Sequence, residues 1–140
     1  MNSLKIEETI ATPKIIFDFD NNNFVLQGCS RPEDVRGFFG PIIEWLHTFR
    51  ESINDDICNK HKDNPVIFKF KFDYFNSSSA KFILDILVLI NDTHAKGLNV
   101  KIDWYYEEND DDMKEVGEEL SEVVDFPFEY FMLESDDSEL

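Results

Sequence analysis

Apolar and polar residues alternate along several short stretches of the chain, which is the period of a strand with one packed face. The clearest stretch predicts a strand over residues 66–75, in which every second residue from Phe68 to Tyr74 is aromatic and faces the core. The same alternation predicts four further strands, at residues 14–19, 24–28, 100–106 and 126–133. Residues 20–23 read Asp-Asn-Asn-Asn, which tolerate a left-handed turn, so the first two of these strands are expected to form a hairpin.

Other segments repeat apolar residues at helical spacing. Ser30 and Glu33 match a capping box, which predicts a helix from there to about residue 53. Pro41 lies inside this pattern and lacks a backbone donor, so we expect a kink or two abutting helices. The polar residues 54–65 are expected to form a loop. Two more helices are predicted, at about residues 80–95 and 113–123.

The expected order is ββαβαβαβ, with about five strands in one mixed sheet and the helices mainly on one face. Strand–helix–strand connections give parallel neighbours, so the fold class is α/β (α+β mixed). We predict one domain over residues 14–133, a flexible lead-in over 1–13 and an acidic tail over 134–140.

The charge balance narrows the possible partners. Thirteen Lys and Arg oppose 30 Asp and Glu among 140 residues, a net charge of −17, which argues against binding to nucleic acid or to an anionic membrane. No apolar run approaches the roughly 20 residues of a membrane span, and no secretory signal is visible at the start. With only two cysteines, a cytoplasmic location is expected.

No motif of an enzyme or of a cofactor site is visible, so we expect neither catalysis nor a bound cofactor. Cys58 and His61 form a CxxH pair, but a zinc site needs further ligands. The acidic residues 107–112 lack the glycine of a calcium loop and suit the start of the following helix. No metal site is therefore expected.

Three serines, Ser77, Ser78 and Ser79, stand between the strand over 66–75 and an apolar helix. The simplest interpretation is that one of them caps the helix. The same position favours an anion, so a phosphoryl group would be tolerated there. Along the helix, an outward stripe contains Lys81, Asp85, Val88 and Asp92, which suits docking unless Val88 is an ordinary exposed apolar residue.

Blocks of sequence spread over residues 9–130 carry a resemblance to a known family. They are Thr12-Pro13-Lys14-Ile15, Gly28 to Glu33 with Phe38-Phe39, Pro41-Ile42-Ile43-Glu44-Trp45-Leu46, Asn76-Ser77-Ser78-Ser79-Ala80-Lys81, Leu84-Asp85-Ile86-Leu87, Trp104-Tyr105-Tyr106-Glu107, Asp111 to Glu119, and Phe126-Pro127-Phe128. In this order they resemble the SiaC-type regulatory phosphoproteins of bacteria. The resemblance implies a STAS-like fold, as in anti-sigma-factor antagonists.

The resemblance also implies a function. It implies reversible phosphorylation of the hydroxyl residue directly after Asn76, which is Ser77 here and usually threonine in the family, with Ser78 and Ser79 as alternatives. A partner kinase would add the phosphate and a metal-dependent PP2C-type phosphatase would remove it. The unphosphorylated form would bind and activate a diguanylate cyclase, which controls cyclic-di-GMP and biofilm formation. We expect this effector to contact Asn76, Ser78, Lys81, Asp85 and Val88.

Two other functions remain open from the sequence. One is a constitutive acidic scaffold or inhibitor that occupies a basic site without any modification. The other is a small-ligand site on the open face of the sheet, near Lys69, Lys71 and Lys101.

Overall fold

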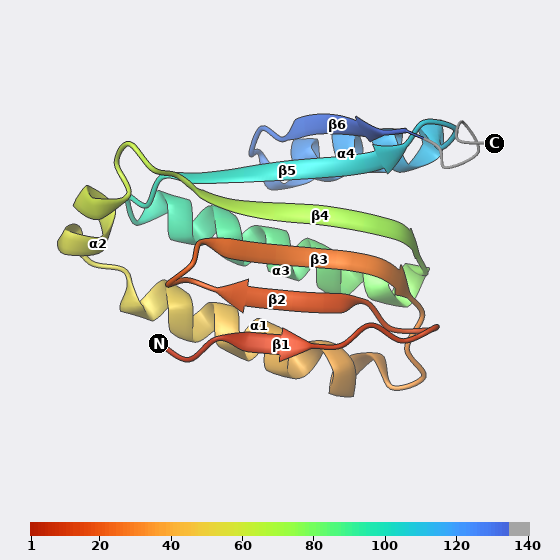
Figure 1. Ribbon diagram of the computed structural model, residues 1–140, viewed down its shortest axis with the longest axis horizontal. Helices are drawn as coiled ribbons and strands as arrows, with labels where there is room; N and C mark the ends of the chain where they lie inside the picture. Colours follow the sequence, from red (N-terminus) through yellow and green to blue (C-terminus); the bar gives the residue numbers. More distant parts are fainter. Residues whose placement is uncertain (135–140) are drawn as a thin grey trace.

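Six strands form one sheet in which the order along the chain is also the order in space (Figure 1). The computed structural model describes residues 1–134, so the predicted acidic tail lies outside the described residues from residue 135 onward. The strands are β1 (Leu4–Ile6), β2 (Lys14–Asp18), β3 (Asn23–Ser30), β4 (Val66–Phe75), β5 (Val100–Glu107) and β6 (Glu129–Leu133). β1, β2 and β3 pair antiparallel, and β3 to β6 pair parallel. The sheet is mixed, as predicted, with six strands rather than about five.

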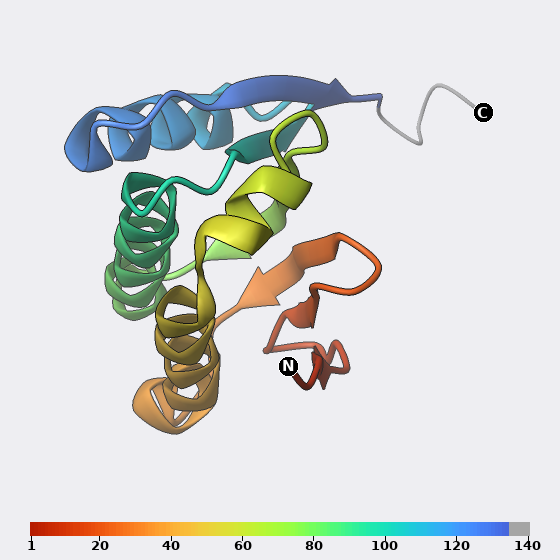
Figure 2. The same cartoon turned by 90° about the vertical axis from the view of Figure 1, so that its left-hand side faces the viewer.

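The helices leave one face of the sheet uncovered. They are α1 (Val35–Ser52), α2 (Asp55–Lys60), α3 (Ser77–Ala95) and α4 (Asp111–Val124). Seen from the side, α1, α3 and α4 lie on one face (Figure 2), where α1 packs on α3 and α4 packs on α3 and β5. The predicted fold class, with helices on one face, is confirmed. Within residues 1–134, no helix combines the length and low polarity that crossing a bilayer needs.

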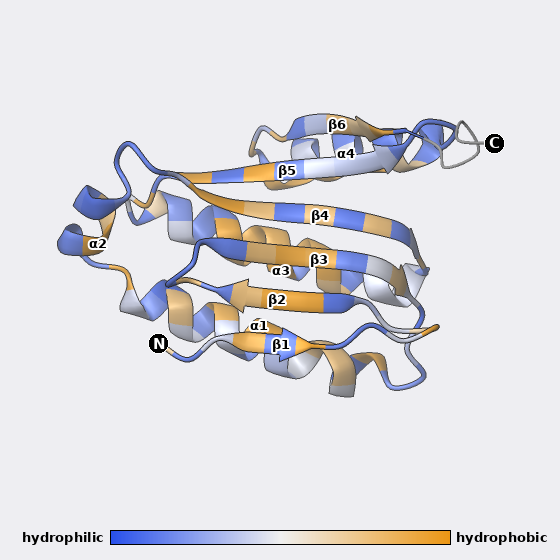
Figure 3. Cartoon of the chain, in the orientation of Figure 1, coloured by the Kyte–Doolittle hydropathy of each residue, from blue (hydrophilic) through white to orange (hydrophobic). Residues whose placement is uncertain are grey.

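Aromatic rings fill the core between the sheet and the helices. The ring centroids of Phe24 and Phe68, on adjacent strands, are 4.5 Å apart. Trp104 stacks on both Phe70 and Phe128, with centroid distances of 5.7 and 5.8 Å. Each such ring buries about 150–250 Å² of mostly apolar surface, which explains why 14 phenylalanines suit so small a domain. Figure 3 shows the resulting alternation of apolar and polar residues along the strands.

The flexible lead-in expected over residues 1–13 is wrong in its central part, because Leu4–Ile6 forms β1. This strand pairs with Ile15–Phe17 of β2. The indole Nε1 of Trp45 also donates a hydrogen bond to the Asn2 carbonyl (2.8 Å). A three-residue strand is too short for its alternation to be recognised in the sequence. β1 is held in place by its pairing with β2 and by the contact of Asn2 with Trp45.

The loop expected over residues 54–65 contains α2. Asn54 caps this helix, since its side chain accepts a hydrogen bond from the Ile57 N–H (2.9 Å). Asp55 and Asp56 lie in the first turn, where the helix dipole favours negative charge. The segment looks like a loop because it is short and only Ile57 and Cys58 of the helix pack against the core, both of them partly buried.

α1 begins later than the capping box predicted. Ser30 ends β3 with a buried side chain, and Asp34 caps α1 by accepting a hydrogen bond from the Gly37 N–H (3.0 Å). Pro41 lies inside one continuous helix, so the prediction of two abutting helices is wrong. Because Pro41 has no N–H, the Gly37 carbonyl has no hydrogen-bond partner within the helix. Both residues are exposed, so water can donate to that carbonyl.

Candidate functional site

The residues 76–79, which we call the Ser77 junction, connect β4 to α3 at the edge of the sheet where β4, β5 and β6 have their carboxyl ends (Figure 1). Asn76 fixes this junction. Its backbone N–H donates to the Ser30 carbonyl (3.0 Å), and its side-chain Oδ1 accepts from the Ser79 N–H (2.9 Å). Asn76 is therefore the cap of α3, which begins at Ser77. The interpretation of a serine as the cap is wrong, and the helix starts three residues before the predicted position.

Ser79 belongs to the core. Its side chain is fully buried, and its hydroxyl lies 2.8 Å from the Ser30 hydroxyl, which is also fully buried. The Ser79 hydroxyl also donates to the Ser30 carbonyl (3.1 Å). Two buried hydroxyls thus satisfy each other and tie the first turn of α3 to the end of β3.

Ser77 and Ser78 differ from Ser79 in burial and in hydrogen bonding. Both are exposed, and neither hydroxyl forms a hydrogen bond within the part of the chain that the structure describes. They occupy the first two positions of α3, where backbone N–H groups have no partner in the helix. The first turn of α3 contains no acidic residue, whereas that of α4 contains two. An anion attached to Ser77 would supply the charge that this helix end lacks.

The outer surface of α3 continues from the Ser77 junction. Lys81 is exposed, Val88 is 43% exposed and Asp85 is half-buried. At a rise of about 1.5 Å and a turn of about 100° per residue, Val88 lies about 17 Å from Ser77 along the helix and within about 20° of the same direction. The structure therefore places Ser77, Lys81 and Val88 along one side of α3. Asn76 is instead half-buried and engaged in capping.

Asp85 and Val88 line a groove between α1 and α3, with a volume of about 300 Å³. Ile43 and His47 line it from α1. The Arg50 guanidinium joins the two helices by pairing with the Asp92 carboxylate (3.3 Å). Two of the predicted contact residues, Asp85 and Val88, therefore border a groove that apolar and charged side chains line together.

The alternation predicts that Tyr74 faces the core, and this prediction is wrong, since Tyr74 is 51% exposed. The register between β3 and β4 shifts after Gly28, which pairs with Phe72, so that Cys29 pairs with Tyr74 and Asp73 is left as an extra residue. Such a bulge reverses which side chains face the core. Gly28, at which the register shifts, has a φ of +111° that glycine adopts without strain, and it is a sequence signal of this bulge. Tyr74 and Asp73 border a second depression beside the Ser77 junction.

The residues considered as metal ligands in the sequence take part in packing and helix capping. His61 is buried against Phe19, with ring centroids 5.1 Å apart, and Cys58 lies near the Lys96 carbonyl. The acidic residues 110–112 start α4, as predicted, and Asp110 is its cap. Among residues 1–134, no group of three or more His, Cys, Asp or Glu side chains is arranged to hold a metal ion.

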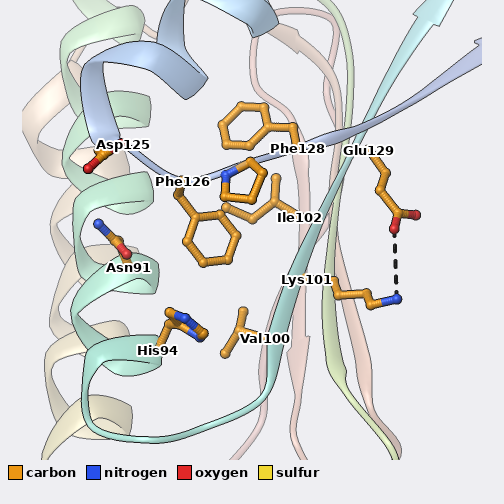
Figure 4. A pocket seen from close by; sticks show the side chains of 10 residues that line it. Asn91, His94, Val100, Lys101, Ile102, Asp125, Phe126, Phe128 and Glu129 are labelled. Carbon is orange, nitrogen blue, oxygen red and sulfur yellow. Dashed lines mark ion pairs between the residues drawn. The ribbon is translucent and has the colours of Figure 1, made fainter.

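A cavity of about 330 Å³ lies away from the Ser77 junction, between α3, the start of β5 and residues 125–129 (Figure 4). Ile102, Phe126 and Phe128 line its apolar part, and Lys101 and Glu129 form an ion pair at its rim (3.7 Å). None of the predicted contact residues lines this cavity. It is therefore not part of the candidate site.

Comparison with known proteins adds four findings. Residues 6–133 match the family model described as SiaC family regulatory phosphoprotein. An uncharacterized protein of Pseudomonas aeruginosa (strain UCBPP-PA14) is 31% identical over 128 residues, which are 91% of this chain and 94% of that protein. The crystal structure of apo-SiaC from Pseudomonas aeruginosa matches with a TM-score of 0.75 and 30% identity, covering 94% of this chain and 98% of that chain.

A further match is the crystal structure of the diguanylate cyclase SiaD in complex with its activator SiaC, also from Pseudomonas aeruginosa. It has a TM-score of 0.76 and 29% identity, and covers 94% of this chain and 99% of the matched chain. The family model, the sequence relative and the two structures agree with the resemblance carried by the sequence blocks. This chain belongs to the SiaC family of regulatory phosphoproteins.

Proposed function

We propose that this chain is a non-enzymatic switch protein whose phosphoacceptor is the Ser77 hydroxyl. The observation that carries the proposal is that Ser77 is exposed, directly follows the capping Asn76, and makes no hydrogen bond with its hydroxyl within residues 1–134. A kinase needs an accessible hydroxyl, and the hydrogen bonds of Asn76 and Ser79 hold the neighbouring backbone so that the Ser77 side chain stays at the surface. Ser79 itself is buried, and Ser78 points about 100° away around the helix.

A phosphate on Ser77 is compatible with the fold. It would meet unpaired N–H groups at the start of α3, and negative charge there is worth about 0.3–1 kcal/mol. Lys81 follows Ser77 by four residues, which is the spacing of neighbouring side chains on a helix. Lys81 is exposed, and its ammonium lies 5.2 Å from the centre of the Phe82 ring. We expect the phosphate to draw this ammonium away from the Phe82 ring and towards the start of α3.

The same phosphate would oppose a docked partner. It adds about −1.5 to −2 charges to a surface that a partner must desolvate, on a chain that already carries −17. A penalty of about 3 kcal/mol weakens binding roughly a hundredfold. An effector that covers the side of α3 from Ser77 to Val88, with contacts to Asn76, Ser78, Lys81 and Asp85, would therefore bind only the unphosphorylated form.

The proposed effector is a diguanylate cyclase, since the structurally similar SiaC of Pseudomonas aeruginosa is the activator of such an enzyme. A serine/threonine kinase and a PP2C-type phosphatase would set the phosphorylation state. In this proposal all of these partners act in the cytoplasm and control cyclic-di-GMP and biofilm formation.

The proposal is tested by isolating the tagged chain from its own cells. Mass spectrometry would map its phosphorylated residues and identify the proteins bound to the wild type, Ser77→Ala and Ser77→Asp. We expect phosphate on Ser77, and a diguanylate cyclase that is bound by Ser77→Ala and lost from Ser77→Asp. Asn109→Asp is the matched control, because it adds the same charge at an exposed turn.

A different result would favour the constitutive acidic scaffold. In that case Ser77 would carry no phosphate, and the wild type and both Ser77 variants would retain the same companion. The net charge of −17 makes a basic partner surface the natural target of such a scaffold.

A further inference from the structure

β6 forms one edge of the sheet, and among residues 1–134 no helix or strand lies beyond it (Figure 1, Figure 2). In a parallel pair of strands, the N–H and C=O of one residue face the same neighbour, and those of the next residue face the opposite way. The Leu133 carbonyl accepts from the Glu108 N–H (2.9 Å), so the backbone groups of Leu133 and Phe131 face β5. Those of Tyr130 and Met132 therefore point away from the sheet, and within the described part of the chain they have no hydrogen-bond partner.

β6 lacks the features that protect edge strands from further pairing, which are shortness, lysine, proline and bulges. β1, at the other edge, has only three residues, with Lys5 at its centre. β6 has five residues, contains neither lysine nor proline, and pairs with β5 without a register shift. It also exposes two large apolar residues, Phe131 (38% exposed) and Met132 (54% exposed). The backbone of β6 is thus open to another strand.

Phe131 offers an aromatic surface on the uncovered face of the sheet. One side of its ring stacks on Tyr105 of β5, with a centroid distance of 5.1 Å. The other side of the ring points away from β5, to where a side chain of an added strand would lie about 4.8 Å further on. Aromatic and apolar side chains on adjacent strands stabilise each other, so an apolar side chain fits this position.

The helix-covered side of the same edge is acidic. α4 carries six acidic residues and one lysine. Burial raises the pKa of the Tyr130 phenol, a hydrogen bond with Ser121 lowers it, and the carboxylates of Glu118 and Glu122 raise it, so both carboxylates lie close to the phenol. Glu118 and Glu122 are exposed, and neither forms an ion pair within residues 1–134. A basic side chain therefore fits an added strand on this side.

We propose that β6 binds an extended segment of a partner protein as an additional strand, with lysine or arginine side chains towards Glu118 and Glu122 and apolar side chains on Phe131. Hydrogen bonds to the outward backbone groups would supply affinity, and the alternating side chains would supply specificity. A second copy of this chain is the poorer occupant, because pairing two β6 strands would bring two acidic α4 helices together on chains of charge −17. A basic segment turns the same charge into attraction.

The test is an NMR titration of the isotope-labelled full chain with a short capped peptide in which lysine alternates with valine and phenylalanine. We expect saturable binding, with the largest shifts and the greatest slowing of hydrogen exchange at the Tyr130 and Met132 amides, because these amides gain partners. A peptide with glutamate in place of lysine should bind at least about tenfold more weakly, a difference of about 1.4 kcal/mol. The same loss is expected for a peptide whose pairing backbone nitrogens are methylated.

Two variants, each with a matched control, assign the contacts. Met132→Pro removes an outward N–H and leaves the pairing with β5 intact, so it should weaken binding about tenfold or more. Met132→Val loses the same side chain but keeps the N–H, and should bind nearly as well as the wild type. Glu118→Gln/Glu122→Gln should weaken binding about tenfold and reduce its salt dependence. Asp20→Asn/Asp63→Asn removes the same charge from exposed loop positions and should not.

The proposal is overturned if the basic peptide does not bind, if the acidic or methylated peptide binds equally well, or if Met132→Pro binds as well as Met132→Val. If melting shows that Met132→Pro is unfolded, the methylated peptide and the glutamate variants decide the question. Sedimentation of the chain alone should show a monomer, and a dimer dissociated by the basic peptide would assign the edge to a second copy and overturn the proposal. Ser77→Asp should bind the peptide as the wild type does, so the result is independent of the proposed switch.

Discussion

Replacing Ser79 by alanine removes the hydroxyl that completes the buried pair with Ser30. The Ser30 carbonyl keeps a second donor, the Asn76 N–H at 3.0 Å, but the Ser30 hydroxyl, fully buried, loses its side-chain partner. Leaving such a group unsatisfied costs about 1–3 kcal/mol. Alanine is the better helix former and returns up to about 0.5 kcal/mol. We therefore expect Ser79→Ala to lower the free energy of unfolding by about 1–2 kcal/mol.

Urea denaturation measures this loss. With a slope of about 2 kcal/mol per molar urea, the midpoint should fall by about 0.5–1 M. Ser77→Ala and Ser78→Ala are the matched controls and should leave the midpoint nearly unchanged, because both hydroxyls are exposed. The double variant Ser30→Ala/Ser79→Ala should lose less stability than the sum of the two single variants, because no orphaned hydroxyl remains. Equal midpoints for Ser77→Ala and Ser79→Ala would refute the assignment of Ser79 to the core.

Three further predictions follow from local geometry. Ser77→Asp supplies the acidic group missing from the first turn of α3, so its melting temperature should equal or exceed that of Asn109→Asp. A melting temperature clearly below that of Asn109→Asp would contradict the claim that the fold tolerates negative charge at this position. Gly117→Ala should lower the free energy of unfolding, measured by urea denaturation, by about 1–3 kcal/mol, because the new methyl would lie 2.5 Å from Nε1 of the buried Trp104. A variant as stable as the wild type would be inconsistent with this packing. Since burial raises the pKa of Asp103 in the folded chain, the wild type loses stability as pH rises through that pKa. Asp103→Asn should therefore be the more stable form in urea at neutral pH, by a margin that shrinks as the pH falls towards 3.8, the ordinary pKa of the carboxyl, and a margin independent of pH would count against this account.

Long periodic patterns predicted the sheet well. β4 is found over Val66–Phe75, the predicted residues, because the alternation of its side chains is long enough to define both faces. β1 and α2 were not predicted, since elements of three and six residues depend on partners elsewhere in the chain more than on their own pattern. Tyr74 was misplaced because a bulge, which depends on the pairing with β3, reverses the faces after Phe72.

The predicted starts of α1 and α3 were wrong for a related reason. Ser30 matches a capping box in sequence, but its hydroxyl pairs with Ser79, which is 49 residues away. This long-range pair places Ser30 in β3, so that Asp34 caps α1, and draws Ser79 into the core, so that Asn76 caps α3. Three adjacent serines are indistinguishable by sequence pattern, and only the folded chain shows which hydroxyls are exposed.

The most direct test of the central claim compares two forms of the same chain, one unmodified and one carrying phosphoserine at position 77. The measured quantity is the affinity of each form for the proposed effector, a diguanylate cyclase. This account predicts that phosphate on Ser77 weakens binding about a hundredfold, while both forms melt at similar temperatures. Equal affinity of the two forms would contradict it.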